Sequence, residues 1–365
     1  MRLTLEHLSH RVGAEPYLYD LDLTLQDGSL NVLLGPTQSG KTSLLRIMAG
    51  LDRPTSGRVL IDGSDVTGVS VRRRNVAMVY QQFINYPSLT VYDNIASPLR
   101  QKKALGARDI DQKVRSTAQM LRIDHLLERL PAELSGGQQQ RTAIARALVK
   151  DAELLLLDEP LVNLDYKLRE ELREELRSLF GSGRTTVVYA TTEPQEALIL
   201  GGHTAVLDAG RVLQFGPALA VHHRPSNMRV AEVYSDPPIN FIPLHIDGDS
   251  CRISEDARFP RPEHMRGLVS GLYRAGIRAH HVAVGGAAVA TVPAIVQLAE
   301  ISGSETFVHA RHGELSLTAQ LAGVHDYRLG ERVTLHFDPA RLFVFDDSGA
   351  LVAAPRHSAF DRKVA

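Results

Sequence analysis

The sequence predicts two domains, an α/β domain with a helical insert over residues 1–235 and a small all-β domain over residues 236–365. Three observations lead to this prediction. The chain has 365 residues, more than a single hydrophobic core usually serves. Short apolar runs alternate with helical patterns in the first two thirds, which is typical of α/β layering. After Asp236-Pro237-Pro238 the pattern changes to short β-rich segments separated by turns.

Individual elements follow from local patterns. Three apolar runs read as buried strands that each lead into a helix: residues 31–34, 153–157 and 185–189. Between about residues 82 and 134 no strong strand pattern occurs. There, residues 110–127 carry apolar side chains at helical spacing, which predicts a helical insert. Beyond residue 236 we predict short strands at residues 241–246, 294–298, 306–310, 333–337 and 342–345.

Composition excludes several functional classes. Lysine and arginine total 41 against 42 aspartate and glutamate, a net charge of −1, so no global basic field indicates a nucleic-acid partner. The single cysteine, Cys251, excludes an intramolecular disulfide, and we interpret it as structural. The N-terminal segment lacks a secretory signal, and glycines and a proline interrupt the low-charge stretch 282–299. We expect a cytoplasmic chain whose contact with a membrane would be peripheral.

The segment Gly35-Pro36-Thr37-Gln38-Ser39-Gly40-Lys41-Thr42 matches the phosphate-binding loop G-x-x-x-x-G-K-[ST] in full. An apolar run leads into it, and from Ser43 onward the pattern is that of a helix that can end at Gly50. The glycines let backbone N–H groups surround an anion, and the helix N-terminus adds partial positive charge. In this reading Lys41 reaches the terminal phosphates of a nucleotide and the Thr42 hydroxyl is a ligand for Mg²⁺.

Two carboxylates, Asp158 and Glu159, end the apolar run 154–157. A buried parallel strand that ends in this way brings its carboxylates to the ligand crevice of an α/β sheet. An isolated Asp-Glu pair is usually a solvated turn. Beside a phosphate-binding loop, we predict that Asp158 holds Mg²⁺ through water and that Glu159 polarises the attacking water as general base.

The sequence Leu134-Ser135-Gly136-Gly137-Gln138 predicts a second helix N-terminus that faces an anion, because a hydroxyl and two glycines precede a helical run. Together with the two preceding motifs, this segment resembles the ATP-binding subunit of an ABC transporter. In that family the LSGGQ of one subunit closes over the nucleotide held by the loop of the other. The resemblance therefore implies that Ser135, Gly136, Gly137 and Gln138 contact ATP bound to a second ABC ATPase subunit.

Other family landmarks follow in order. Gln81 matches the glutamine that links Mg²⁺ and the attacking water to the helical insert, and Asn163-Leu164-Asp165 matches the D-loop. Thr192 occupies the position of the switch histidine, where relatives read Tyr-x-Thr-His-Asp-Gln-x-Glu-Ala. Threonine donates one neutral hydrogen bond from a short side chain, whereas histidine reaches further and can carry charge. We expect a weakened site, and His203 lies too far along the chain to compensate.

Two further departures concern the nucleotide. Val12 stands where an aromatic residue usually stacks on adenine, with Tyr17 and Tyr19 nearby. Tyr17 could stack on the base in its place, or could equally pack within a hairpin. Gln38 replaces a small residue within the phosphate-binding loop, which could narrow the loop without removing its backbone donors. Together with Thr192, these departures suggest a heterodimer with a second, different ATPase, although a homodimer with two weakened sites stays open.

Resemblance extends beyond the ATPase motifs. His223-Arg224-Pro225-Ser226-Asn227 and Asp338-Pro339-Ala340-Arg341-Leu342-Phe343 resemble segments of carbohydrate importers of the maltose and glycerol-3-phosphate type, with an OB-like regulatory barrel. The resemblance implies an ATP-hydrolysing subunit, peripheral on the cytoplasmic face of the inner membrane. Its partners would be transmembrane permease subunits and, indirectly, a periplasmic or extracellular substrate-binding protein. The cargo would be a carbohydrate or polyol, with glycerol or glycerol phosphate as candidates.

Two alternatives remain at this stage. A soluble ABC ATPase outside transport would typically have tandem ATPase domains or a basic surface, and this chain has one phosphate-binding loop and near-zero net charge. A regulator with a vestigial ATPase site would explain Thr192 but not the presence of Lys41, Gln81, Asp158 and Glu159.

Overall fold

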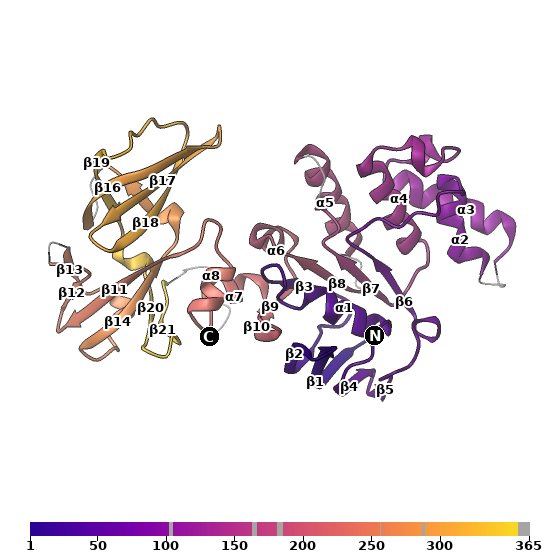
Figure 1. Ribbon diagram of the computed structural model, residues 1–365, viewed down its shortest axis with the longest axis horizontal. Helices are drawn as coiled ribbons and strands as arrows, with labels where there is room; N and C mark the ends of the chain where they lie inside the picture. The colour runs from indigo at the N-terminus through magenta and orange to yellow at the C-terminus, as the bar shows by residue number, and fades with distance from the viewer. Residues whose placement is uncertain (102–104, 163–165, 181–184, 256, 287–288, 357–365) are drawn as a thin grey trace. The chain divides into compact units, whose positions relative to one another are not determined.

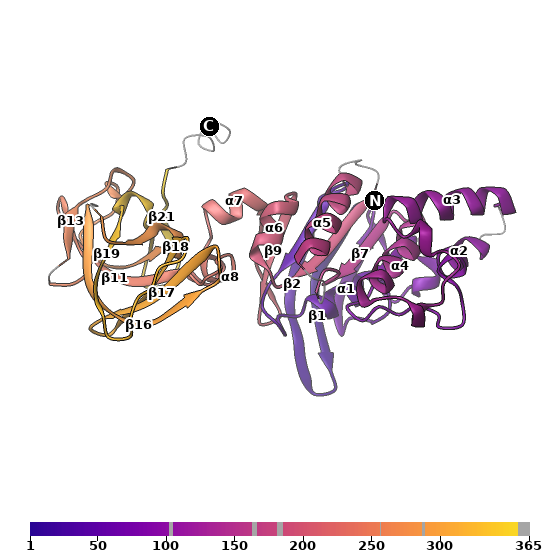
Figure 2. The same ribbon diagram turned by 90° about the horizontal axis from the view of Figure 1, so that it is seen from above.

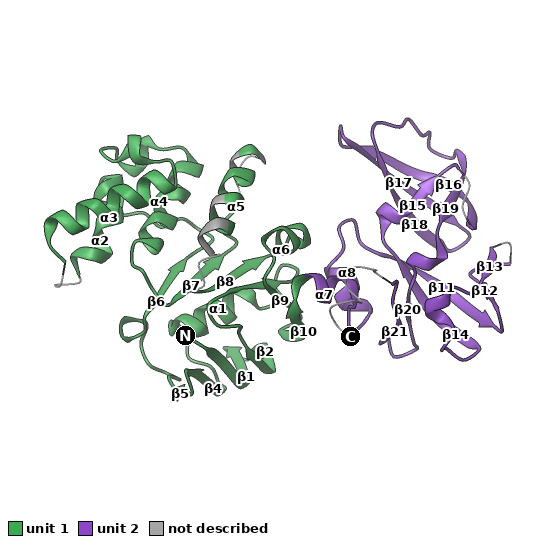
Figure 3. Cartoon of the chain, turned by 180° about the vertical axis from the view of Figure 1, so that it is seen from behind, with its two compact units in different colours: residues 1–218 green, residues 219–365 purple. Residues whose placement is uncertain are grey.

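The computed structural model describes residues 1–356 apart from 102–104, 163–165, 181–184, 256 and 287–288. The chain divides into two compact units, residues 1–218 and 219–365 (Figure 3). The first is an α/β unit with a helical insert and the second is all-β apart from short helices, so the predicted fold class is confirmed. The predicted D-loop, residues 163–165, lies outside the described residues.

Unit 1 contains a six-stranded, mostly parallel sheet in the order β10-β9-β3-β8-β7-β6 and a four-stranded antiparallel sheet in the order β2-β1-β4-β5 (Figure 1). The strands of the larger sheet are β3 (Leu30–Leu34), β6 (Val76–Val79), β7 (Leu154–Asp158), β8 (Thr186–Thr191), β9 (His203–Asp208) and β10 (Arg211–Pro217). Those of the smaller sheet are β1 (Leu3–Val12), β2 (Glu15–Thr24), β4 (Ser56–Ile61) and β5 (Ser64–Asp65). The helices are α1 (Lys41–Ala49), α2 (Val91–Arg100), α3 (Ala107–Met120), α4 (Gly136–Leu148), α5 (Tyr166–Phe180) and α6 (Pro194–Leu200).

The core of unit 1 explains why its apolar runs become central strands. Every residue of β3, β7 and β8 is buried, as expected for parallel strands covered on both faces. Helix α1 packs between the two sheets. Its Leu44, Ile47 and Met48 share one core with leucines of β1 and β2 and with residues of β7 and β8. The helix that follows β3 is therefore fixed on two sides.

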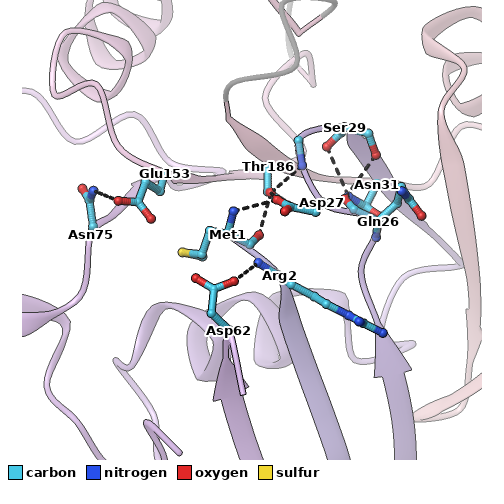
Figure 4. A network of polar contacts seen from close by, with 11 residues as sticks. Met1, Arg2, Gln26, Asp27, Ser29, Asn31, Asp62, Asn75, Glu153 and Thr186 are labelled. Atoms are coloured by element: carbon cyan, nitrogen blue, oxygen red, sulfur yellow. Dashed lines mark hydrogen bonds and ion pairs between the residues drawn. The ribbon is translucent and has the colours of Figure 1, made fainter. Parts of the chain in front are cut away.

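Polar contacts secure the end of the sheet where β7 and β8 begin (Figure 4). The Thr186 hydroxyl lies 2.9 Å from the Met1 carbonyl oxygen and accepts a hydrogen bond from the Gly28 N–H at 3.0 Å. The Arg2 N–H donates to Asp62 at 2.7 Å. Because Thr186 is the first residue of β8, this network ties the antiparallel sheet to the central sheet at the end opposite the phosphate-binding loop.

The helical insert is a separate group of helices, α2, α3 and α4, at one end of unit 1 (Figures 1 and 2). Val114, Ala118, Leu121 and Leu126 are buried, as the spacing predicts. The helical pattern predicted for residues 110–127 continues past the actual end of α3 at Met120. Arg122 has a φ of 55°, in the left-handed region, so the helix stops there and Leu126 enters the core from a short 3₁₀ turn.

Unit 2 is built from two antiparallel sheets, in the orders β13-β12-β11-β14-β20-β21 and β15-β19-β16-β17-β18. The first sheet comprises β11 (Asn240–Asp247), β12 (Ser250–Arg252), β13 (Arg258–Pro260), β14 (Gly271–Ile277), β20 (Phe343–Phe345) and β21 (Leu351–Ala353). The second comprises β15 (Val282–Val284), β16 (Ala290–Ile301), β17 (Glu305–His312), β18 (Leu315–Ala322) and β19 (Arg332–Phe337). Four of the predicted C-terminal strands lie within β11, β16, β17 and β19, and the fifth, predicted at residues 342–345, corresponds to β20, which begins one residue later.

The two sheets enclose a single barrel-like core. Alternate residues of β16, namely Ala290, Val292, Ala294 and Val296, point inward, which is the period expected of a half-buried strand. The sheets are joined where the Asn240 side chain exchanges two hydrogen bonds with the backbone of Thr318, at 2.9 and 2.7 Å. Cys251 is buried in this core, as its structural interpretation requires.

The division between the units falls after the first residue of α7 (Ala218–His223) and before α8 (Met228–Val233), whereas the predicted boundary follows residue 235. Both helices bond to the all-β unit. The Arg278 guanidinium donates to the His222 carbonyl oxygen at 2.7 Å, and the Met228 N–H donates to the Gly349 carbonyl oxygen at 2.9 Å. The breaker at residues 236–238 marks a turn inside unit 2 rather than the edge of its core.

Candidate nucleotide site

Strand order brings the predicted site residues to one edge of the central sheet. β3 pairs in parallel with β8, and β8 with β7, so the segments that follow these strands are neighbours. The Gly35 N–H donates to the Thr191 carbonyl oxygen at 3.3 Å, and the Glu159 N–H donates to the Ala190 carbonyl oxygen at 3.0 Å. The phosphate-binding loop, the acidic end of β7 and Thr192 therefore meet at the same edge.

Steric constraints explain the two glycines of the loop. A Cβ on Gly35 would lie 2.3 Å from the Leu207 carbonyl oxygen, and a Cβ on Gly40 would lie 2.6 Å from Leu18 Cδ2. Gly40 also has a φ of 100°, which side chains strongly disfavour. Gln38 adopts a φ of 66°, but its side chain is exposed. The effect of Gln38 on the width of the loop stays a prediction.

Lys41 begins α1 and points back into the loop. Its side chain is only 4% exposed, and Nζ donates to the carbonyl oxygens of Gly35 at 2.8 Å and Pro36 at 3.0 Å. The same nitrogen lies 3.5 Å from Glu159 Oε1. Burial lowers the pKa of Lys41, and the carboxylates of Glu159 and Asp158 act in the opposite direction. The ammonium is thus held in the loop among oxygen acceptors, in a position where it could contact the oxygens of a bound phosphate.

Oxygen ligands gather beside the lysine. Thr42 Oγ1 donates to Asp158 Oδ1 at 3.2 Å, and Gln81 Nε2 donates to Glu159 Oε2 at 3.0 Å. Asp158 is 2% exposed, and burial raises the pKa of its carboxyl while the Thr42 hydrogen bond lowers it. A hydroxyl, a carboxylate and an amide carbonyl are the hard oxygen ligands that Mg²⁺ prefers, so the set formed by Thr42, Asp158 and Gln81 fits that ion.

Glu159 has a strained backbone, with a φ of 45° in the left-handed region. Its carboxylate contacts both Lys41 and Gln81, two residues that precede it by more than seventy positions in the chain. Neither contact is readable from the sequence, because each depends on β6, β7 and the loop after β3 lying in register. Strain of this kind is concentrated at functional sites.

Thr192 follows β8 directly and lies one residue beyond the carbonyl that binds Gly35. The sequence analysis gave no role to the buried network behind it. Glu196 Oε2 accepts hydrogen bonds from Thr191 Oγ1 at 2.7 Å and Tyr189 Oη at 3.0 Å. Burial raises the pKa of Glu196. Tyr189 and Thr191 lie two residues apart, so their hydroxyls face the same side of the strand. This spacing is the sequence signal that could have predicted the network, which holds Thr191 next to Thr192.

His203 does not replace the missing histidine. It opens β9 and pairs in register with Asn31, near the start of β3, whereas Gly35 follows the end of that strand. His203 therefore lies at the opposite end of the sheet from the loop, as expected.

Tyr17 lies in β2 with its backbone against the phosphate-binding loop. A Cβ on Gly40 would stand 3.3 Å from the Tyr17 carbonyl oxygen, and the Tyr17 residue is 43% exposed. Val12, at the end of β1, is 55% exposed. Tyr19 is engaged elsewhere, because the Arg211 guanidinium lies 4.9 Å from its ring centre. Tyr17 thus remains the aromatic residue predicted to stack on adenine.

Helix α4 begins at the predicted second anion site. Ser135 is its N-cap and forms a capping box with Gln138: the Ser135 hydroxyl accepts from the Gln138 N–H at 3.4 Å, and Gln138 Oε1 accepts from the Ser135 N–H at 3.0 Å. Ser135 and Gly136 are exposed. Within the described part of the chain, no hydrogen bond joins residues 135–138 to residues 35–43.

The segment that follows Gln81 is bonded to α4. The Asn85 amide donates to the Gln139 carbonyl oxygen at 2.9 Å. The Arg146 guanidinium lies 4.8 Å from the Tyr86 ring centre and donates to the Ile84 carbonyl oxygen. Gln81, which contacts Glu159, is therefore followed within five residues by Asn85 and Tyr86, and both of these contact α4, the helix that starts with the LSGGQ segment.

A groove of about 790 Å³ borders this connection in unit 1. Its walls come from the end of α1, β6, the segment after Gln81, α2 and α4, and they include Leu51, Met78, Tyr86, Pro98 and Arg146. The sequence analysis predicted the helical insert but did not identify this groove.

Comparison with known proteins places the chain in a family. Residues 18–162 match the family model described as ABC transporter, and residues 275–345 match the TOBE domain. The uncharacterized ABC transporter ATP-binding protein YcjV of Escherichia coli is 34% identical over 352 residues, which cover 94% of this chain and 97% of that protein. The chain belongs to the ABC transporter ATP-binding proteins. It is an ABC ATPase with a C-terminal TOBE domain.

Two further relatives of this ABC ATPase carry transport names. The xylose/arabinose import ATP-binding protein XacK of Haloferax volcanii is 38% identical, with 90% of this chain and 87% of that protein covered. The sn-glycerol-3-phosphate import ATP-binding protein UgpC of Pectobacterium atrosepticum is 34% identical, with 93% and 95% covered.

Among solved structures, the dimeric ATP-binding cassette MJ0796, in a post-hydrolysis state bound to ADP and Pi, is similar with a TM-score of 0.54 and 30% identity. The match covers 59% of this chain and 98% of the chain in that structure. The described part of our ABC ATPase has no helix that is both long and apolar enough to cross a membrane.

Proposed function

We propose that this ABC ATPase powers an importer for a carbohydrate or polyol, with glycerol and glycerol phosphate among the candidate cargoes. One observation carries the ATPase part of the proposal. Lys41, Thr42, Gln81, Asp158 and Glu159 come from distant parts of the sequence and meet within hydrogen-bond or ion-pair distance. The transport part is supported by the xylose/arabinose and glycerol-3-phosphate import relatives, whose similarity extends through the C-terminal unit.

Each residue of the site has a chemical role in the proposed reaction. Residues 35–43 bind the ATP phosphates through backbone N–H groups, and Lys41 neutralises charge on the terminal phosphates. Thr42, Gln81 and Asp158 would hold Mg²⁺, which neutralises charge that develops on the phosphate oxygens. Glu159 accepts a proton from the attacking water, and its contact with Gln81 orients the carboxylate.

Thr192 is the residue of this site that we expect to reduce the rate of ATP hydrolysis. A histidine at the same position could donate from an extended, chargeable ring, and the loss of one oriented donor commonly reduces turnover by a factor on the order of 10² to 10³. We therefore propose that the chain works beside a second, different ATPase subunit. In this pair the exposed LSGGQ start of α4 completes the partner's site, while the chain's own site binds ATP and hydrolyses it slowly.

The groove beside Gln81 supplies the contact with the permease in this proposal. It is open, partly apolar, and connected to Glu159 through the segment after Gln81 and to the LSGGQ segment through α4. A helix from a cytoplasmic loop of a transmembrane subunit would bind in this groove and would move when the two ATPase subunits close on ATP. The chain would accordingly be peripheral on the cytoplasmic face of the inner membrane, and a periplasmic or extracellular substrate-binding protein would act through the permease.

Affinity purification of the full chain from detergent-solubilised membranes tests the transport assignment. Wild type should recover subunits with several membrane-spanning helices, identified by mass spectrometry. Leu51→Glu places a charge in the groove and should reduce that recovery at least fivefold. Ile199→Glu is the matched control, because both side chains are about 40% exposed and Ile199 lies on α6 outside the groove. Recovery of soluble partners alone would instead favour an ABC ATPase outside transport.

A further inference from the structure

The turn between β9 and β10 contacts both the phosphate-binding loop and β2, which lies beside β10 (Figure 1). Its residue Gly210 uses both of its backbone polar groups in these contacts. The Gly210 N–H donates to the Ser39 carbonyl oxygen at 3.1 Å, and the Gly210 carbonyl oxygen accepts from the Tyr19 N–H at 3.0 Å. One residue therefore joins the loop predicted to bind phosphate to the strand that carries Tyr17.

Gly210 permits this close approach because it has no side chain. A Cβ at this position would lie 2.3 Å from the Tyr17 carbonyl oxygen and 2.9 Å from Tyr19 Cδ2. Gly210 also has a φ of 75°, which residues with a side chain rarely adopt. The three atoms nearest to that Cβ all belong to Tyr17 and Tyr19. A larger residue would therefore push β2 away from the turn and leave the loop in place.

Gly40 packs against the same part of β2 from within the phosphate-binding loop. A Cβ on Gly40 would lie 2.6 Å from Leu18 Cδ2 and 3.6 Å from the Gly210 Cα. Leu18 is 1% exposed and belongs to the core of unit 1. On the exposed side, the Arg211 guanidinium lies 4.9 Å from the Tyr19 ring centre. The loop, the turn and the core thus hold β2 at one point.

We propose that Gly210 is a positioning residue for the nucleotide base. By holding β2 against the phosphate-binding loop, it fixes the spacing between Tyr17, predicted to stack on adenine, and the N–H groups that bind the phosphates. The base and the phosphates belong to one ligand, so both are bound at full strength only where the two parts of the site already have that spacing. The inference rests on the proposed function, because it requires a nucleotide at the loop.

Equilibrium binding of ADP and of pyrophosphate to the full chain, with Mg²⁺ present, separates base binding from phosphate binding. Pyrophosphate has the phosphate chain of ADP without the base. Gly210→Ala should weaken ADP binding at least about tenfold, as expected when a base–aromatic stack is lost, and pyrophosphate binding less than about twofold. Tyr17→Ala should show the same selective loss. The double variant should bind ADP little more weakly than Tyr17→Ala, because Gly210 acts through Tyr17.

Gly63→Ala is the matched control for backbone strain. Gly63 has a φ of 80° between β4 and β5, and a Cβ there would have no described atom within 4 Å. This variant has the strained backbone of Gly210→Ala without the clash, so its affinity for either probe should change less than about twofold.

Arg211→Met tests the same link without a change in the backbone, and it does not depend on whether Gly210→Ala folds. Both Arg211 and Tyr19 are exposed, so the variant should fold. Loss of the guanidinium from the Tyr19 ring should weaken ADP binding about two- to fivefold and leave pyrophosphate binding unchanged.

The two probes also distinguish failure of this inference from failure of the proposed function. Equal losses for ADP and pyrophosphate in Gly210→Ala, or an equal loss of ADP affinity in Gly63→Ala, would overturn the inference and leave the nucleotide site intact. Unchanged ADP affinity in Tyr17→Ala would overturn it as well. A wild-type chain that binds neither probe would contradict the proposed function itself.

Discussion

Two helices of unit 1 begin at motifs that can face an anion, and their surroundings differ. Helix α1 starts with Lys41, which is buried and lies beside the carboxylates of Glu159 and Asp158. Helix α4 starts after Ser135, which is exposed and whose hydroxyl is bonded only within its own first turn among the described contacts. The first helix start has the residues for catalysis around it in the same chain.

This difference indicates which step each helix start can support: phosphate binding and activation at α1, and stabilisation of an anion from another molecule at α4. A charged, desolvated lysine beside a general base can bind and activate phosphate by itself. A neutral helix N-terminus with two glycines can stabilise an anion only when a second surface brings that anion to it. In the proposed function, the α1 site would therefore hold ATP, and the start of α4 would face a neighbouring subunit.

The largest effect should come from removing the base at the α1 site. Glu159→Gln keeps the size of the side chain and a group that can contact Gln81, but it cannot accept the proton from water. We expect turnover to fall by roughly 10² to 10⁴, with ATP affinity changed less than threefold. Steady-state hydrolysis and nucleotide binding measure the two effects. Glu128→Gln, an exposed carboxylate in the insert, should leave both unchanged.

A charge at the start of α4 should separate the two helix N-termini. Nothing lies within 4 Å of a Cβ added to Gly136, so Gly136→Ala and Gly136→Asp should both fold. The aspartate would repel phosphates of a partner's ATP and reduce stimulated turnover on the order of 10². Alanine should cost less than tenfold. Equal ATP affinity of both variants at their own phosphate-binding loop would support separate roles for the two helix N-termini. Loss of that affinity in Gly136→Asp would contradict this separation.

A smaller effect, of opposite sign, is expected on stability at the α1 site. Burial holds the pKa of Asp158 above its ordinary value of 3.8, so the folded state binds this proton more tightly than the unfolded state. The carboxylate thus destabilises the fold increasingly as the pH rises through and beyond that ordinary value. Asp158→Asn should raise stability at pH 7 by roughly 1 kcal/mol while it reduces hydrolysis.

Urea unfolding at pH 7 and pH 4 checks this prediction. The gain of Asp158→Asn over wild type should be smaller at pH 4 than at pH 7, because the raised pKa of the native carboxyl favours its protonated form as the pH falls. Asp151→Asn, which makes the same substitution at an exposed side chain, is the matched control. A gain that is equal at both pH values would mean that burial of the charge is not its cause.

The smallest effect concerns the loop that surrounds Lys41. Gln38 adopts a left-handed φ of 66° with an exposed side chain, so Gln38→Gly should stabilise the protein by about 0.5 kcal/mol. Thr37→Gly, at an exposed neighbour whose φ lies outside the left-handed region, should instead be destabilising. Thermal unfolding of both variants measures the difference. Destabilisation by Gln38→Gly would mean that the glutamine side chain contributes to the loop.

Sequence patterns predicted the parts of this molecule that depend on local chemistry. The phosphate-binding loop, the buried strands around Asp158 and the cap at Ser135 each follow from residues close together in the chain. The predicted strands of unit 2 follow from alternation in the same way. Contacts that depend on register, such as Lys41 with Glu159 and the Glu196 network behind Thr192, were not predictable, because distant segments form them.

Boundaries were predicted less well for related reasons. The end of α3 depends on the left-handed backbone of Arg122, which apolar spacing does not encode. Helices α7 and α8 are held to the strands of unit 2 by hydrogen bonds such as that from Arg278 to the His222 carbonyl oxygen and by apolar contacts, and none of these follows from local sequence, whereas the prolines after the helices do.

ATP hydrolysis by the purified chain is the most direct test of whether the α1 site is complete apart from Thr192. Wild type, Thr192→His and the double variant Thr192→His with Glu159→Gln would be compared at concentrations high enough for dimerisation. We expect slow hydrolysis by wild type, an increase on the order of 10² with the histidine, and loss of that gain in the double variant. Brisk hydrolysis by wild type that the histidine does not increase would contradict this expectation and favour a homodimer with two competent sites.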